Sequence, residues 1–134
     1  MIKGLIFHHI GIATGNIELT SAFYLNTGHS ISPIIDDSIQ NVKICFISGG
    51  LSPLIELVSP LTVTSPVSKI ISNQGVVPYH ICYEVKDINK SILLLKQHKF
   101  IPLNRPVPAI ALENRMICFL YSKDYGLIEL LQSK

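Results

Sequence analysis

The chain has 134 residues, of which 48% are hydrophobic and 15% are charged, and its formal net charge is +2. This composition excludes a disordered chain, and the weak charge excludes the basic surface that nucleic-acid binding requires. No apolar run approaches the roughly 20 residues of a membrane span, and the N-terminal sequence lacks a signal-peptide pattern. We therefore expect a single cytoplasmic domain, residues 1–134, that binds neither nucleic acid nor membranes.

The first half of the chain predicts a strand, a helix and three shorter strands. An apolar run at 5–13 predicts the first strand. Asn16 can cap the following helix by accepting a hydrogen bond from its first turn, and Gly28 can end the helix. The helix residues expected to face inward are Ile17, Thr20, Ser21, Phe23 and Tyr24. The three strands are expected at about 29–36, 42–48 and 53–59.

A connecting helix is expected at about 64–75, where Ser65 precedes Pro66 and Gly75 follows. The second half then repeats the order of the first, with an apolar run at 78–85 and a helix that Asp87 can cap. The residues of that helix expected to face inward are Ile88, Ile92 and Leu95. The strands that follow are expected at about 99–104, 114–121 and 126–131.

Short sequence matches indicate that the two halves are copies of one unit. HIGI at 9–12 corresponds to HICY at 80–83, ICFI at 44–47 to ICFL at 117–120, and LIEL at 54–57 to LIEL at 127–130. The offset rises by two residues after the first match, as a difference in loop length would cause. We predict an α+β fold of two tandem βαβββ modules, about 1–60 and 76–134, joined by the helix at 64–75.

Each copy carries a histidine in its first strand and a glutamate in its last strand. The histidines are His9 and His80, and the glutamates are Glu56 and Glu129. An unpaired carboxylate buried in such an apolar strand costs several kcal/mol, and a divalent cation would remove that cost. A lone strand histidine is usually structural and a strand glutamate can be exposed at an edge, but the repetition of both favours a metal site.

Two further groups of residues are interpreted as structural. Strand alternation predicts that His8 points to the face opposite His9. Cys45, Cys82 and Cys118 are odd in number and lie in apolar segments, which predicts buried, reduced thiols.

Resemblance to the vicinal-oxygen-chelate (glyoxalase/bleomycin-resistance) superfamily is carried by FHHIGIATGNIELTSAFY, PLIELVSP, SPVSKII, PYHICYEVKDINKSI and GLIELLQ. Within it the chain most resembles the methylmalonyl-CoA epimerases, and glyoxalase I more distantly. The resemblance covers essentially the whole chain. It implies that the two modules form a cupped mixed sheet around a cavity that holds a divalent metal ion.

The resemblance also implies the residues of the site and its chemistry. The implied metal ligands are His9, Glu56, His80 and Glu129, and Zn, Ni, Co or Mn would suit this mixed set. The metal polarises a substrate carbonyl, and a carboxylate removes the neighbouring proton. From the sequence itself we expect that carboxylate to be Glu129, once it leaves the metal, or Glu113, the repeat counterpart of Gln40. The implied protein is a homodimeric, metal-dependent isomerase, epimerase or lyase acting on a thioester or a 2-oxo compound.

One position departs from the epimerase pattern, in which a glutamate precedes the stretch that here reads Gln40 to Val42. Ile39 occupies that position, so we expect poor activity on methylmalonyl-CoA. Glu113, the repeat counterpart of Gln40, either lines the cavity from the other side or is a solvated loop residue. A non-catalytic, antibiotic-type small-molecule binding protein is the alternative function, although four intact ligands favour an enzyme. A third function, that of a ring-cleaving iron dioxygenase, is disfavoured because those enzymes use one carboxylate ligand and typically have longer chains.

Overall fold

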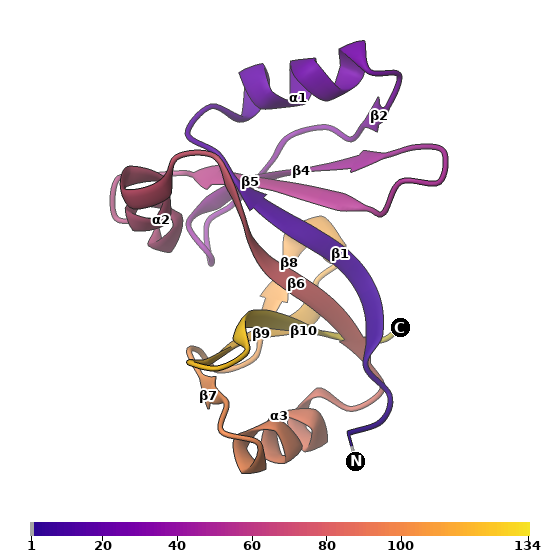
Figure 1. Cartoon of the computed structure of the whole chain (residues 1–134), viewed down its shortest axis with the longest axis vertical. Helices are drawn as coiled ribbons and strands as arrows, with labels where there is room; N and C mark the ends of the chain where they lie inside the picture. Colours follow the sequence, from indigo (N-terminus) through magenta and orange to yellow (C-terminus); the bar gives the residue numbers. More distant parts are fainter. Residues whose placement is uncertain (1) are drawn as a thin grey trace. The chain divides into compact units, whose positions relative to one another are not determined.

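The computed structural model describes residues 2–134, which divide into two units, residues 9–79 and residues 2–8 with 80–134 (Figure 1). The boundaries between the units fall within strands β1 (Ile6–Ala13) and β6 (Val77–Val85). Each unit carries one βαβββ repeat whose second strand is split into two short pieces. The predicted α+β fold of two βαβββ modules is therefore confirmed.

The unit of residues 9–79 is a mixed sheet with a helix packed against it. Its elements are β1, α1 (Ile17–Asn26), β2 (Ser30–Ile31), β3 (Ile35–Asp37), β4 (Val42–Ser48), β5 (Ile55–Pro60) and α2 (Pro66–Gln74). The strand order is β2-β4-β5-β1, with β3 also paired to β4. Strand β5 runs parallel to β1 and antiparallel to β4, and α1 packs against β4 and β5 (Figure 1).

Helix α1 begins at the predicted cap. The side chain of Asn16 accepts a hydrogen bond from the backbone N–H of Leu19 at 3.0 Å. Ile17 is buried as predicted, but Phe23 is 62% exposed. Six residues rotate a helix by about 240°, which turns Phe23 away from the buried face of Ile17. The hydrophobic cluster beneath the helix is formed by Ile17, Cys45, Ile47 and Leu57.

Helix α2 also begins and ends where the sequence predicts. Ser65 caps it by accepting from the backbone N–H of Val67, Pro66 is its first residue, and Gly75 follows with a φ of 71°. Its role as a connection inside one domain stays a prediction. Among residues 2–134 no helix has the length and apolar character needed to cross a membrane.

The other unit repeats this arrangement with the second half of the chain. Its elements are β6, α3 (Ile88–Gln97), β7 (Ile101–Pro102), β8 (Val107–Ala109), the 3-10 helix η1 (Ile110–Leu112), β9 (Arg115–Ser122) and β10 (Gly126–Gln132). The strand order is β6-β10-β9-β7, with β8 also paired to β9. Strand β10 runs parallel to β6 and antiparallel to β9, as β5 does between β1 and β4.

The start of helix α3 is fixed by two side chains. Asp87 accepts a hydrogen bond from the backbone N–H of Lys90 at 3.1 Å, as predicted for a cap. Gln132, at the end of β10, accepts from the backbone N–H of Ile88 at 2.9 Å. The helix packs into a cluster formed by Val85, Ile88, Leu95, Phe100, Cys118, Leu120, Ile128 and Leu130.

Two predicted strands are shorter than the sequence indicated. The segment 29–36 is split into β2 and β3, and the segment 99–104 contains only the two-residue β7, while β8 was not predicted. Proline cannot donate a hydrogen bond to a strand ladder, and Pro33 lies in the first break while Pro106 lies in the second. In both breaks a polar side chain bonds to the adjacent long strand instead: Ser32 Oγ accepts from Phe46 N at 2.7 Å, and Asn104 Oδ1 accepts from Phe119 N at 2.9 Å.

The turns that enter β4 and β9 are also related by the repeat. Asn41 and Asn114, 73 residues apart, both have a φ of 59°. Asparagine tolerates this left-handed conformation better than most residues because its short side chain can bond locally. The duplication therefore extends to backbone conformation.

The three cysteines are buried and no disulfide joins them, as predicted. Cys45 and Cys118 lie in the two hydrophobic clusters beneath the helices. Burial raises the pKa of each of these two thiols from an ordinary value of 9.0 to about 11. Both are therefore protonated at neutral pH.

The cap of helix α3 gives a prediction for stability. Asp87→Ala removes the acceptor for Lys90 N–H and should lower the free energy of unfolding by about 1 kcal/mol. Asp87→Asn keeps an acceptor oxygen and should stay close to the parent. Urea denaturation of the three proteins measures the difference. An equal loss in both variants would show that the negative charge, and not the cap, is what matters.

The raised thiol pKa values give a prediction for alkaline pH. A pKa raised by folding means that the contribution of the protonated thiols is complete below pH 9 and is lost as the pH rises through about 11. The free energy of unfolding should therefore fall over this interval. The fall should be shallower in a Cys45→Ala, Cys118→Ala double variant, measured by urea denaturation at several pH values. Parallel curves for the two proteins would contradict it.

Candidate metal centre

In the unit of residues 9–79, His9 and Glu56 form a buried pair. The register of the parallel strands places Gly11 of β1 opposite Glu56 of β5. His9 is two residues before Gly11 and therefore shares its face of the sheet. The His9 Nε2 atom lies 3.5 Å from Glu56 Oε1, and both side chains are almost completely buried.

In the other unit, His80 and Glu129 form the equivalent pair. Cys82 of β6 lies opposite Glu129 of β10, and His80 is two residues before Cys82. The His80 Nε2 atom lies 3.5 Å from Glu129 Oε1, and both side chains are buried. The two pairs thus agree in residue type, atoms and separation, as a duplicated site requires.

A phenylalanine contacts each histidine. The rings of His9 and Phe46 meet edge to face, with centroids 5.7 Å apart, and those of His80 and Phe119 do the same at 5.1 Å. These phenylalanines lie opposite Glu56 and Glu129 in the strand pairings. Each packs beside its imidazole and keeps water from that side. The sequence repeat contained this signal, since ICFI and ICFL each carry the phenylalanine, but the two rings were not predicted as part of the site.

The geometry of each pair fits two ligands of one metal ion. A separation of 3.5 Å is longer than the roughly 2.7–2.9 Å of a charged hydrogen bond between nitrogen and oxygen. Metal bonds of about 2.0–2.2 Å place neighbouring ligand atoms about 3–3.5 Å apart. Imidazole nitrogen and carboxylate oxygen together suit the divalent ions from Mn to Zn. Each half can therefore supply two ligands to a divalent ion.

The structure places the other candidate residues outside these pairs. Glu113 lies in the turn before β9, its side chain is 72% exposed, and it forms a 3.2 Å ion pair with Lys134. Ile39 is exposed in the turn between β3 and β4. Asp37, at the start of that turn, is buried and accepts hydrogen bonds from the backbone and side chain of Gln40. A catalytic role for Glu113 stays a prediction.

Comparison with known proteins identifies relatives of this chain. Residues 8–119 match the model of the glyoxalase/bleomycin resistance protein/dioxygenase superfamily. The human mitochondrial methylmalonyl-CoA epimerase is 32% identical over 130 residues, covering 94% of this chain and 73% of that protein. The ethylmalonyl-CoA/methylmalonyl-CoA epimerase of Cereibacter sphaeroides is 33% identical over 129 residues, covering 93% and 96%.

Solved structures show the same fold. A hypothetical protein from Bacillus halodurans is 32% identical, with a TM-score of 0.85 over 98% of this chain and 96% of that chain. The methylmalonyl-CoA epimerase of Mycobacterium tuberculosis, at 20% identity, has a TM-score of 0.85 over 100% and 93%. The resemblance seen in the sequence is confirmed, and the chain belongs to the glyoxalase/bleomycin resistance protein/dioxygenase superfamily.

Proposed function

We propose that this protein is a metal-dependent isomerase of the methylmalonyl-CoA epimerase type, which moves a proton next to the carbonyl of an acyl-CoA thioester. The observation that carries the proposal is the repeated, buried pair of one histidine and one glutamate. Relatives that share about a third of the sequence over nearly its whole length carry the name of this activity.

We propose that both pairs bind the same divalent ion, so that His9, Glu56, His80 and Glu129 are its ligands. All four side chains are buried, which suits ligands that must exclude competing water. Two carboxylates and two neutral imidazoles would balance the charge of Zn, Ni, Co or Mn. Bound there, the ion would draw charge from the substrate carbonyl and stabilise the enolate that forms on loss of the neighbouring proton.

The proton transfer needs carboxylates of the chain itself, and we propose Glu129 and Glu113. Glu129 is buried on the strand face that carries His80, so it would lie next to a carbonyl held at the metal and could accept the proton once it leaves the metal. Glu113 must leave its ion pair with Lys134 before it can accept a proton. We therefore assign the main role to Glu129. A homodimer, a lyase reaction and a cytoplasmic location stay predictions.

Metal binding is the first test of this proposal. His9→Ala and His80→Ala should each weaken binding of Mn or Zn strongly, because each removes one of four ligands, whereas His98→Ala changes only an exposed histidine. Chelation of the metal-loaded parent should lower its melting temperature, because an ion bound only by the folded state stabilises it. Unchanged affinity in both ligand variants would refute the assignment.

Proton exchange is the second test. Metal-loaded protein should incorporate deuterium from heavy water into methylmalonyl-CoA, and Glu129→Gln should abolish this. The parent should be slow because Ile39 cannot carry a proton. Ile39 is exposed in its turn, so Ile39→Glu should fold and gain activity within the range of about 10²–10⁴-fold that general acid–base catalysis contributes. Ile39→Gln is the matched control, since it adds polarity without a base.

Two outcomes of this experiment would count against us. Fast exchange by the parent, with no gain in Ile39→Glu, would show that Ile39 does not occupy the position of a missing base. Tight metal binding without exchange in any variant would favour the non-catalytic binding protein.

A further inference from the structure

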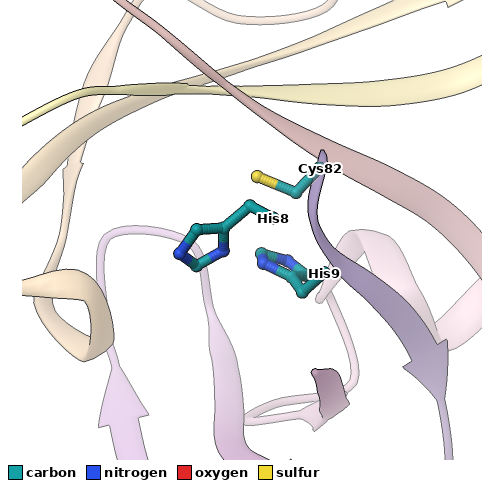
Figure 2. A group of neighbouring side chains, drawn as sticks. All are labelled: His8, His9 and Cys82. Atoms are coloured by element: carbon teal, nitrogen blue, oxygen red, sulfur yellow. The ribbon is translucent and has the colours of Figure 1, made fainter. Parts of the chain in front are cut away.

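His8 and Cys82 lie together in the unit of residues 2–8 and 80–134. A ring nitrogen of His8 and the sulfur of Cys82 are within 4.8 Å of each other. Figure 2 shows the imidazole of His8 on β1 and the thiol of Cys82 on β6, with His9 the next residue along β1. The interpretation of His8 as a structural residue on the face opposite His9 stays a prediction, and its closeness to Cys82 favours a metal-binding role.

Cys82 differs in its surroundings from the other two cysteines. Cys45 and Cys118 belong to the hydrophobic clusters under the helices, where a thiol replaces a small apolar side chain. Cys82 lies opposite Glu129 in the strand register and two residues after His80. Its side chain is therefore on the same face of the sheet as Glu129 and His80, and not on the face that packs against the helix. Its repeat counterpart is Gly11, which has no side chain. Only the second half therefore presents a thiol on this face.

The donor atoms of this pair suit a soft metal ion. A thiolate and an imidazole are the ligands preferred by Cu⁺ and by Zn²⁺, whereas carboxylates suit harder ions. Bonds of about 2.0 Å to nitrogen and about 2.3 Å to sulfur span about 4.3 Å when the ion lies between them. The donor atoms of His8 and Cys82 lie within 4.8 Å of each other, which matches this span. Cys82 is buried, while His8 is half-buried and offers a route from solvent.

We propose that His8 and Cys82 form a second metal site, selective for thiophilic ions of the Cu⁺ class. The ion binds between the ring nitrogen of His8 and the sulfur of Cys82, and the proton of the thiol leaves to solvent as the metal–sulfur bond forms. This site uses neither Glu56 nor Glu129. It therefore stands independently of the epimerase proposal.

The test is an anaerobic titration of Mn²⁺-loaded protein with Cu⁺ against a chromogenic Cu⁺ chelator. The parent should bind one Cu⁺ per chain, and X-ray absorption should show one sulfur and at least one nitrogen neighbour. Cys82→Ser and His8→Ala should each weaken binding about tenfold or more, the scale of losing a group that supports a metal. Cys118→Ser is the matched control and should bind Cu⁺ as the parent does.

Glu129→Gln separates this site from the proposed catalytic one, because it should lose proton exchange and keep Cu⁺ binding. If Cys82→Ser fails to fold, as circular dichroism would reveal, Cys82→Ala and His8→Ala decide the question. Parent-like Cu⁺ affinity in these variants, or absence of sulfur from the absorption spectrum, would overturn the proposal.

Discussion

The pairing of a buried carboxylate with an imidazole, made once in each half of the chain, is the constraint on which the remaining structure depends. Burying Glu56 or Glu129 in an apolar strand is unfavourable by several kcal/mol unless a positive charge or a metal balances it. The same strands place Leu57 and Leu130 in the hydrophobic clusters. One strand in each half therefore contributes both to the core and to the buried histidine–glutamate pair.

The two halves each contain a histidine–glutamate pair but differ around it. Glu84 and Arg115 form an ion pair in the second half, and Arg115 Nε also donates to the carbonyl of Gln132. The repeat counterparts in the first half are Ala13 and Val42, which cannot form such a pair. The two halves therefore carry different side chains at matching positions of the repeat.

The starts of the helices were predicted well because a capping side chain bonds to a backbone N–H only two or three residues further along the chain. Asn16, Ser65 and Asp87 all cap helices as expected. The closeness of each histidine to its glutamate was also predictable, because the same pattern occurs in both halves.

Other features depended on three-dimensional context that the sequence does not reveal. Phe23 is apolar yet exposed, since the helix has more apolar residues than its buried face can hold. The proximity of His8 to Cys82 joins residues 74 positions apart, and alternation along one strand does not reveal it. The role of Ser32 and Asn104 as substitutes for strand carbonyls depends on where the prolines break each strand.

The parallel pairing of β1 with β5 has a consequence for which insertions and deletions the chain tolerates. Side chains alternate between the faces of a strand, so removing one residue inside β5 would exchange the places of Glu56 and Leu57. The carboxylate would enter the hydrophobic cluster and the leucine would leave it. The two copies already differ in length by two residues, and the difference falls between the matched strand segments. The one difference in length between the two copies thus leaves the alternation within the matched strand segments intact.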